Sequence, residues 1–415
     1  MNPAGRKYLI DASTIRGGGG ITHLVNVIPE LARMAPQDSF RVICCDKRIP
    51  AALPELANLE VDYLGEMRLR DRVRFKYRGV ARRAAEWGAD LYFSCGEMAP
   101  LSAPCPMVAA FRNPNVFDLG ASYKLSWKQQ LRLRLLNVAA RVSARSCERV
   151  MFVSEDSARW MGDAAGLPME KRVAIAHGID PARWRRPERE QRESHERPYI
   201  LSVSSIYAYK NYLRLIEAYA ELAESHPGVP DLVIVGDNQD DDYLARMQAA
   251  REATGELAEQ IHIVGEVSYD EIHRWYHGAS LFVFPSYLET FGIPMLEAMA
   301  AGLPIVAADT PVFREIAADA AFYADPFDTR AFADAMSEVL FRPGAAAALA
   351  KRGTERLREF TWRRSASRLL ALFRSVLAHE ASAPEPAGAL AFPLTATRPA
   401  ALAAPGFARH VRRSH

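Results

Sequence analysis

The sequence predicts an α/β protein built from two doubly wound domains with largely parallel sheets. Its 415 residues exceed what one hydrophobic core usually supports. Hydrophobic residues make up 49% of the chain and charged residues 25%, which is typical of soluble globular enzymes. Short apolar runs alternate with longer helix-like segments along most of the chain, and such alternation indicates βαβ units.

The first domain is expected over residues 1–182. Its predicted strands are the apolar runs at 8–10, 40–45, 91–93, 107–111 and 150–153. A charged stretch without apolar periodicity follows at 183–198, and we expect a surface linker there.

The second domain is expected over residues 199–361. Its predicted strands lie at 199–203, 231–236, 261–265, 281–285, 304–309 and 321–325. Helical spacing of apolar residues then predicts a helix over 362–380 that packs back toward the first domain. The tail, 381–415, is dominated by Ala, Pro and Gly and is expected to be disordered. Two Rossmann-like domains in tandem would face a central cleft, and open α/β sheets bind ligands beyond the carboxyl ends of their strands.

The charge is nearly balanced overall but not along the chain. A formal net charge of +2 is too small for a protein that neutralises nucleic-acid phosphates, so we expect no nucleic-acid partner. Residues 1–195 hold 31 Lys and Arg against 22 Asp and Glu, so this half carries +9 and the remainder −7. A basic first half suits an anionic substrate or surface, and a solvated surface without a partner is an equal alternative.

Cysteine usage and hydropathy predict a cytoplasmic protein. The five cysteines include no Cys-x-x-Cys pair, which indicates reduced thiols and no metal site. The beginning of the chain shows no apolar leader, and no apolar run reaches the ~18 residues of a membrane span.

The stretch 287–309 contains the most informative motif. A loop with Glu289, Phe291, Gly292 and Ile293 follows a predicted strand and enters a helix with Pro294 in its first turn. The start of a helix offers free backbone N–H groups and a positive dipole end, which suit phosphate or hydroxyl oxygens. Glu297 is expected in the first turn of this helix, facing the same cleft as Glu289.

This motif resembles the retaining glycosyltransferases of the GT-B fold, in their large fourth sequence family. Glu289 and Glu297 stand in its Glu-x7-Glu spacing, and further matching pieces occur in order along the chain: VSEDS at 153–157, HGID at 177–180, YKN at 209–211, VGE at 264–266 and FTW at 360–362. The resemblance implies that Glu289 contacts donor-sugar hydroxyls, Glu297 holds the nucleotide ribose and Lys210 faces the diphosphate. It also implies that five further residues at matching positions contact the donor: Phe291, Gly292, Ile293, Ser205 and Val264.

The residue chemistry agrees with these roles. Neighbouring ribose hydroxyls can both donate to one carboxylate, and lysine is a compact point charge for a diphosphate. The family usually has a Gly-Arg pair where this chain has Ser204 and Ser205, so one diphosphate contact is missing or comes from elsewhere. Tyr209 stands where a basic residue is common, and Arg214 is either a substitute or a solvated helix residue.

In the first domain, a glycine run and a polar segment are the candidate acceptor or diphosphate contacts. Gly18, Gly19 and Gly20 precede a helix expected to begin near residue 21, so this loop could lie against the ligand. His23 is either an acceptor contact or a packing residue. Arg112 and Asn113 follow a strand where the family often has a histidine, and Asn113 is a substrate contact or simply a turn former.

Two charged segments carry weaker predictions. Asp240, Asp241 and Asp242 are expected to lie in a loop and not in a metal site. Residues 68–83 contain eight basic side chains and one acid, with apolar residues at helical spacing. This segment is either a domain helix with a solvated basic face or a contact with anionic lipid.

The expected function is sugar transfer from a nucleotide-diphosphate donor to a saccharide or lipid-linked saccharide acceptor, with retention of configuration. A mannose-like hexose or deoxyhexose is the expected sugar, and bacterial surface polysaccharide synthesis is the expected context, with peripheral contact to the inner face of the membrane as an option. No cofactor and no metal are expected, because Lys210 and helix-start amides would meet the diphosphate charge. A non-catalytic sugar-nucleotide-binding protein, an epimerase and a phosphorylase are the alternatives, and the base, acceptor and linkage stay open.

Overall fold

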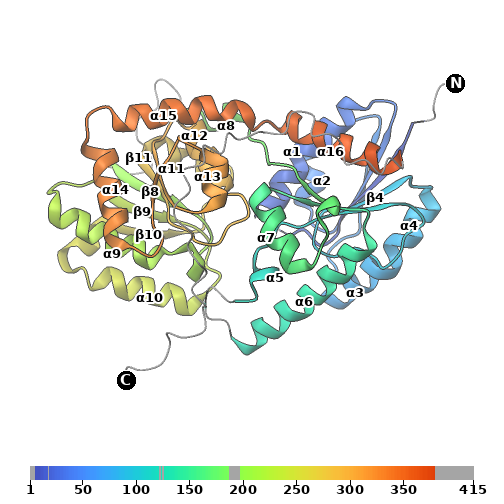
Figure 1. Ribbon diagram of the computed structural model, residues 1–415, viewed down its shortest axis with the longest axis horizontal. Coiled ribbons are helices and arrows are strands. Elements are labelled where there is room, and N and C mark those ends of the chain that lie inside the picture. Colours follow the sequence, from blue (N-terminus) through green and yellow to red (C-terminus); the bar gives the residue numbers. More distant parts are fainter. Residues whose placement is uncertain (1–4, 17, 121–122, 124–125, 187–196, 379–415) are drawn as a thin grey trace. The chain divides into compact units, whose positions relative to one another are not determined.

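The computed structural model describes residues 5–16, 18–120, 123, 126–186 and 197–378 (Figure 1). The predicted disordered tail at 381–415 and most of the predicted linker lie outside the described residues. Among the described residues, no helix combines the length and apolarity needed to cross a bilayer.

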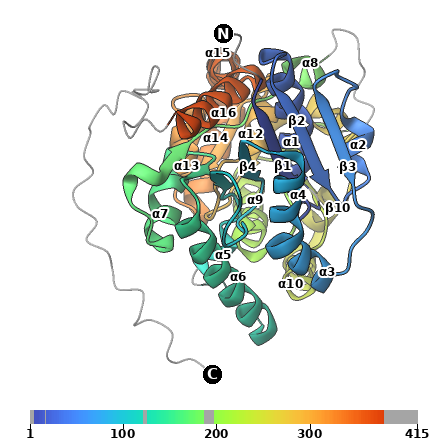
Figure 2. The same cartoon turned by 90° about the vertical axis from the view of Figure 1, so that its right-hand side faces the viewer.

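The first lobe contains a seven-stranded sheet in the order β3-β2-β1-β4-β5-β6-β7, and every pair is parallel. Its strands are β1 (Lys7–Ala12), β2 (Ser39–Cys44), β3 (Leu59–Tyr63), β4 (Leu91–Ser94), β5 (Met107–Ala110), β6 (Arg149–Phe152) and β7 (Arg172–Ala174). Figure 2 shows β1, β2 and β3 side by side. The sequence prediction missed β3 and β7, because both are edge strands and neither has the fully buried apolar run of a central strand.

Helices connect these strands and cover the sheet. They are α1 (Gly18–Met34), α2 (Arg48–Ala52), α3 (Leu69–Arg74), the π-helical turn η1 (Phe75–Gly79), α4 (Val80–Trp87), α5 (Asn115–Asp118), α6 (Trp127–Ser146), α7 (Glu155–Ala165) and the 3₁₀ turn η2 (Met169–Lys171). The short helix α8 (Pro181–Trp184) crosses the predicted boundary at residue 182, and Trp184 is buried. The predicted linker therefore begins with packed residues.

The second lobe contains a six-stranded parallel sheet in the order β10-β9-β8-β11-β12-β13. Its strands are β8 (Tyr199–Val203), β9 (Asp231–Val235), β10 (Ile261–Gly265), β11 (Ala279–Phe284), β12 (Ile305–Ala308) and β13 (Phe322–Ala324). Its helical elements are η3 (Ala208–Lys210), α9 (Tyr212–Ser225), α10 (Asp241–Glu252), η4 (Gly255–Gln260), α11 (Ile272–Gly278), α12 (Ile293–Ala300), α13 (Pro311–Ala317), α14 (Thr329–Phe341), α15 (Ala345–Arg356) and η5 (Leu357–Glu359). Both sheets thus confirm the predicted pair of Rossmann-like α/β domains.

The acidic run in this lobe begins a helix, so the predicted loop there is wrong in part. Asp240 is the N-cap of α10, and its side chain accepts a hydrogen bond from the backbone N–H of Tyr243 at 3.0 Å. Asp241 and Asp242 form the first turn, where negative charge stabilises the helix.

The last helix, α16 (Trp362–Leu377), returns to the first lobe and packs against α1. Phe373 lies within 5.3 Å of the Tyr8 ring and 5.2 Å of the Phe93 ring, measured between centroids. Two strands of the first sheet therefore bury their side chains against a helix from the far end of the chain.

The basic segment at 68–83 is not the single regular helix that its spacing predicts. The π-helical turn η1 separates α3 from α4, and a π turn holds an extra residue that shifts the helical face. As a result Val73 is 38% exposed while Val80 is fully buried, so these two residues do not share one stripe. Lys76, counted among the surface cations of this segment, is also fully buried.

Lys76 forms a buried ion pair at the carboxyl end of β1. Its Nζ donates to Asp11 Oδ2 at 2.8 Å and to Ser94 Oγ at 2.7 Å. The Tyr92 hydroxyl donates to Asp11 Oδ2 at 2.7 Å, and the Ser13 N–H donates to Asp11 Oδ1 at 2.9 Å. Burial alone would raise the pKa of Asp11, but the Lys76 ammonium and these hydrogen bonds lower it below its ordinary value. The pair therefore fixes the ends of β1 and β4 to the segment 75–79.

We predict that Lys76→Met destabilises the protein by about 3 to 5 kcal/mol, because it leaves the Asp11 carboxylate buried without its cation. Urea unfolding measures the loss. The control is Arg78→Met, which removes an exposed cation two residues away and is expected to change stability by less than about 0.5 kcal/mol. Equal effects of the two substitutions would contradict a structural role for the buried pair.

Candidate functional site

Two predicted donor residues, Lys210 and Glu289, lie where the strand order of the second sheet reverses. The chain leaves β8 toward one side of the sheet and continues from β11 toward the other, and ligands of open α/β sheets bind at such switch points. Lys210 ends η3 in the loop after β8, and Glu289 lies in the loop after β11. Lys210 Nζ is 2.5 Å from Glu289 Oε1, and both side chains are largely buried. The structure therefore brings these two predicted residues together as an ion pair.

Backbone contacts hold the two loops in place. The Tyr287 N–H donates to the carbonyl of Tyr209 at 3.1 Å. Asn211 adopts a left-handed conformation with φ of 64°, and its side-chain amide donates to the carbonyls of Pro285 at 3.2 Å and Pro326 at 2.7 Å. The loop carrying Lys210 is thus fastened to the ends of the neighbouring strands.

Glu297 lies in α12, whose N-cap is Gly292. Gly292 has φ of 97°, a conformation that side-chain-bearing residues rarely adopt. Ile293 is the first residue of α12, so Glu297 is in its second turn and not the first. The Tyr276 hydroxyl donates to Glu297 Oε2 at 2.7 Å. Burial raises the pKa of Glu297 to about 7, although the Tyr276 hydrogen bond and the Arg183 charge oppose this shift.

Phe291 packs into a group that contains two buried histidines. Its ring centroid lies 4.9 Å from that of His177, in an edge-on arrangement. His177 Nδ1 is 3.0 Å from His23 Nδ1, so one ring must donate and the other accept. Burial lowers the pKa of His177 to about 3 and that of His23 well below its ordinary value, and the charge of Arg112 adds to both shifts. Both imidazoles are therefore neutral at physiological pH.

The glycine run does not form the predicted loop before residue 21. Helix α1 already begins at Gly18, and Gly17 lies outside the described residues. The missing side chains instead allow close packing, because a Cβ on Gly19 would lie 3.0 Å from Ile293 Cδ1 and one on Gly20 would lie 3.0 Å from Ile15 Cγ2. The start of α1 thus lies against the start of α12.

Arg112 and Asn113 follow β5, and Glu97 holds their backbone. Glu97 Oε1 accepts from the Arg112 N–H at 3.0 Å and from the Asn113 N–H at 2.8 Å. The Arg112 guanidinium donates to the carbonyl of Cys95, which turns this side chain inward. Asn113 Oδ1 accepts from the Asn115 N–H at 3.1 Å, which is the turn-forming role that the sequence left open.

Two polar atoms near this point are buried without a hydrogen-bond partner. Arg112 Nη1 and His23 Nε2 are shielded from solvent, and the described part of the chain gives neither of them a hydrogen-bond partner. Buried polar atoms are usually paired, so an unpaired arginine nitrogen after β5 and an unpaired ring nitrogen on α1 are candidate ligand contacts.

The remaining predicted residues lie apart or have structural contacts. Ser205 is half-buried after β8, whereas Val264 is 39% exposed on β10, which β9 separates from β8. Arg214 Nη1 donates to the carbonyl of Phe327 at 2.7 Å and to Thr329 Oγ1 at 3.1 Å, so this guanidinium secures the start of α14.

Sequence reasoning missed a tyrosine cluster beside Lys210. The rings of Tyr207 and Tyr209 stack at 5.2 Å, and the Tyr123 ring lies 5.1 Å from that of Tyr209. The Tyr123 hydroxyl donates to Asn115 Oδ1 at 2.8 Å. The Tyr-Ala-Tyr pattern at 207–209 was a usable signal, because aromatic faces are common in saccharide-sized sites.

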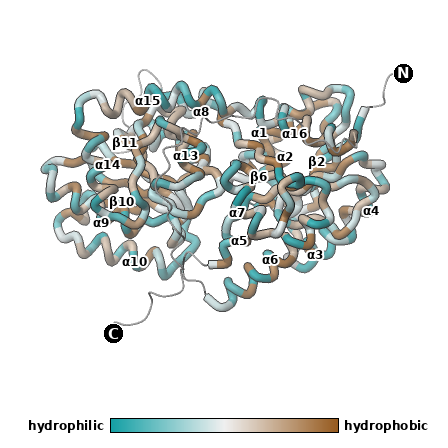
Figure 3. The backbone as a smooth tube through the Cα atoms, in the orientation of Figure 1, coloured by the Kyte–Doolittle hydropathy of each residue, from teal (hydrophilic) through white to brown (hydrophobic). Residues whose placement is uncertain are grey.

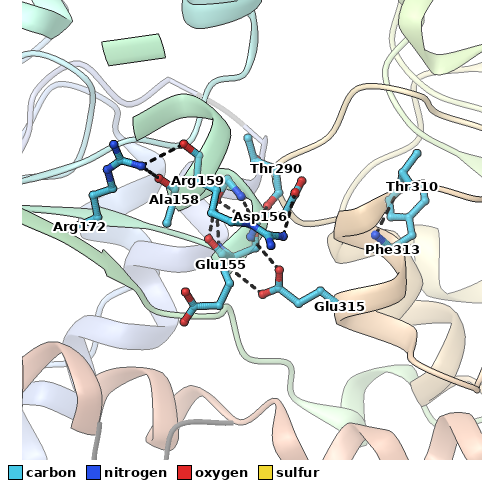
Figure 4. Close-up of polar contacts among 11 residues, drawn as sticks. Glu155, Asp156, Ala158, Arg159, Arg172, Thr290, Thr310, Phe313 and Glu315 are labelled. Atoms are coloured by element: carbon cyan, nitrogen blue, oxygen red, sulfur yellow. Dashed lines mark hydrogen bonds and ion pairs between the residues drawn. The ribbon is translucent and has the colours of Figure 1, made fainter. Parts of the chain in front are cut away.

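A second missed feature is a carboxylate of α13 at the start of α7 (Figure 4). Glu315 accepts from the backbone N–H of Glu155 at 2.8 Å and of Asp156 at 2.9 Å. Ser154, the N-cap of α7, donates through its Oγ to the carbonyl of Thr290 at 2.7 Å. Thr290 Oγ1 in turn donates to the carbonyl of Arg112 at 3.0 Å. The loop that carries Glu289 is thus bonded directly to two segments of the first sheet.

Solved structures share this architecture. HepE of Anabaena, in complex with UDP and glucose, aligns with a TM-score of 0.70 at 18% identity over 89% of this chain and 100% of its own. WaaG, a glycosyltransferase involved in lipopolysaccharide biosynthesis, aligns with a TM-score of 0.67 at 18% identity over 88% of this chain and 99% of its own. The chain therefore has the GT-B fold, which confirms the fold class predicted from its sequence.

Sequence comparison matches the second lobe to a known family. Residues 185–356 match the family described as glycosyl transferases group 1. The O-antigen chain mannosyltransferase RfbU of Salmonella typhimurium is 27% identical over 54% of this chain and 59% of its own length. Glycogen synthase of Mycobacterium tuberculosis is 32% identical over 46% of this chain and 45% of its own. The chain spans about half the length of the curated relatives it matches.

The raised pKa of Glu297 predicts a pH-dependent cost in stability. Between pH 4.5 and about 7 the folded protein retains a proton on Glu297 that the unfolded chain has lost, so the stability of the wild type falls relative to Glu297→Gln as the pH rises. The difference should grow to at most about 3 kcal/mol and level off above pH 7. Urea unfolding across this range tests it, and the exposed Glu221→Gln should show no such trend.

Proposed function

We propose that this protein is a metal-independent retaining glycosyltransferase that moves a sugar from a nucleotide-diphosphate donor to a saccharide or lipid-linked saccharide acceptor. The observation that carries the proposal is the Lys210–Glu289 pair at the switch point of the segment that matches the group 1 family. A cation and a carboxylate held side by side can meet a phosphate and a sugar hydroxyl of one donor molecule.

Each donor group has a matching partner in this arrangement. The Lys210 ammonium binds the diphosphate, and Glu289 accepts from hydroxyls of the transferred sugar. Glu297 keeps Oε1 for the ribose hydroxyls while Tyr276 holds Oε2. Before the donor binds, the ion pair keeps Lys210 and Glu289 positioned, so little side-chain order has to be gained on binding.

The first lobe contributes groups for the acceptor and the leaving phosphate. His23 Nε2 and Arg112 Nη1 are buried and have no partner among the described residues, so each could form a hydrogen bond with a bound ligand. Arg112 also brings a positive charge to this place, which compensates in part for the arginine absent at Ser205. The tyrosine faces beside Lys210 suit the apolar face of a sugar ring.

The proposed chemistry needs no protein nucleophile. The bond between the anomeric carbon and the diphosphate oxygen breaks, the acceptor hydroxyl oxygen bonds to the same face of that carbon, and its proton passes to the leaving phosphate. Lys210 and Arg112 stabilise the charge that develops on the phosphate. No cofactor takes part.

The relatives suggest which substrates to test first. HepE of Anabaena is described with UDP-glucose, and RfbU of Salmonella typhimurium is named an O-antigen chain mannosyltransferase. We therefore propose a hexose donor and an acceptor of surface polysaccharide synthesis, made at the inner face of the membrane. Melting-temperature shifts with UDP, GDP, ADP and dTDP identify the base, because a bound nucleotide stabilises the native state by mass action. Turnover of the matching nucleotide sugar then distinguishes a transferase from a non-catalytic binder.

We predict that Glu297→Ala weakens binding of the preferred nucleotide diphosphate by about 1.5 to 3 kcal/mol, because a charge-assisted bond to the ribose is lost. Isothermal titration calorimetry measures the change. Glu221→Ala, at an exposed position of the same lobe, is the control and should bind as the wild type does. Unchanged affinity in a folded Glu297→Ala protein would exclude the ribose contact.

We also predict that transfer activity survives an excess of EDTA, because Lys210, Arg112 and helix-start amides meet the diphosphate charge. Initial rates with and without the chelator test this. Loss of turnover that added magnesium restores would show that the donor is bound as a metal complex and would contradict the prediction.

A further inference from the structure

Helix α6 carries an apolar stripe that the rest of the fold leaves uncovered. Trp127 is 70% exposed, Leu131 51%, Leu135 64% and Val138 60%. Their spacing of four, four and three residues places them on one face of the helix. Figures 1 and 2 both show one end of α6 projecting beyond the neighbouring helices. Single exposed apolar residues are common, but four on one helical face form a patch.

Basic side chains flank this stripe, and α6 contains no acidic residue at all. The exposed cations of the helix are Lys128, Arg132, Arg134, Arg141 and Arg145. Hydrophobic and hydrophilic segments alternate along α6 in Figure 3. The opposite face carries the small, buried residues Ala140, Ser143 and Ala144, which pack against the lobe. The helix is therefore held by one face and presents the apolar and basic residues outward.

We propose that the exposed face of α6 docks this protein on an anionic lipid bilayer. The apolar stripe would enter the boundary between headgroups and acyl chains, and the flanking cations would pair with headgroup phosphates. Charge selects this occupant, because two copies of α6 would bring ten cations together without a compensating acid. The single aromatic ring of the helix is too little for a nucleic-acid stacking surface.

Neighbouring charges extend the docking surface beyond α6. Arg72 of α3 has a lowered pKa, chiefly because it is partly buried and in part because Arg16 and Arg132 lie near it. Arg72 of α3 therefore lies close enough to Arg132 of α6 to share its electrostatic environment. The sequence left a lipid contact open for 68–83, but among the side chains that the structure describes in this segment Val73 is exposed and Val80 is buried, so these two do not form a comparable apolar stripe.

The position of α6 also relates it to the candidate site. Ser126 caps the helix, and Tyr123 just before it packs on Tyr209, the neighbour of Lys210. A lipid-linked acceptor in the membrane beneath α6 would therefore be held close to Lys210 and the other donor residues. This relation rests on the proposed function, whereas lipid binding by α6 does not.

Vesicle sedimentation tests the proposal with the full chain. We expect binding to vesicles of phosphatidylglycerol and phosphatidylcholine at low salt, weaker binding at high salt and little binding to phosphatidylcholine alone. Lys128→Gln/Arg132→Gln/Arg134→Gln should lower the partition coefficient about fivefold per cation, or about a hundredfold in all. Leu131→Ser/Leu135→Ser should lower it at least about tenfold.

Matched controls change the same chemistry elsewhere. Arg330→Gln/Lys351→Gln/Arg352→Gln removes three cations from exposed positions of α14 and α15, and Met169→Ser/Phe322→Ser removes two exposed apolar side chains. Both should bind vesicles within about twofold of the wild type, since these sites lie outside α6. Brominated lipids should quench the fluorescence of Trp127. This quenching is measured as the difference in fluorescence between the wild type and Trp127→Phe.

The outcomes separate lipid docking from the transferase proposal. Equal binding to both kinds of vesicle, negligible binding to either, or equal losses in the control variants would overturn docking by α6. A dimer in sedimentation velocity that Leu131→Ser/Leu135→Ser dissociates would do so as well, because the stripe would then join two copies. Nucleotide binding should be unchanged in all α6 variants, so its absence in the wild type would count against the proposed function alone.

Discussion

The reversal of strand order in each parallel sheet is the constraint from which the candidate site follows. Because β1 and β4 leave the first switch point in opposite directions, as β8 and β11 leave the second, the loops after these strands cannot be covered by their own connecting helices. Lys210, Glu289, the start of α1 and the start of α12 all lie on such loops or directly after them. The two sheets fix where these loops lie, so the chemistry of the site depends on which side chains the loops carry.

Buried polar contacts then fix those loops. In the first lobe the Asp11–Lys76 pair ties the ends of β1 and β4 to the π-helical turn, and in the second Asn211 ties the Lys210 loop to strand ends. Glu315 and Ser154 bond the two lobes to each other around Thr290. These contacts are specific in geometry and costly to leave half made, so they favour one arrangement of the loops over many.

The sequence predicted the fold class and the central strands, because short apolar runs alternating with helix-like segments are local signals. The resemblance of the 287–309 motif selected Lys210 and Glu289 one by one, and the ion pair between them became visible only in the structure. The sequence could not predict that Lys76 is buried, since the spacing of the eight cations in 68–83 does not set this one apart and the π turn directs it inward. The His23–His177 pair and the Glu315 contact join residues more than 150 positions apart, and no periodicity reports such pairs. The glycine run was predicted to be a loop, but it begins helix α1. Glycine is used both for positive φ in loops and for close packing, and the sequence does not distinguish these two uses.

The return of α16 to the first lobe makes that lobe discontinuous in the chain. Tyr8 and Phe93 are covered by Phe373, which the ribosome adds only after the whole second lobe has been made. During synthesis the first lobe therefore emerges before the helix that packs against α1 exists. It remains incomplete while the ~280 residues between Phe93 and Phe373 are translated, which takes about 15 to 60 s at typical elongation rates. Over that interval the nascent chain exposes apolar side chains of the kind that chaperones bind, and the docking of α16 completes the folding of a lobe whose first strand is β1.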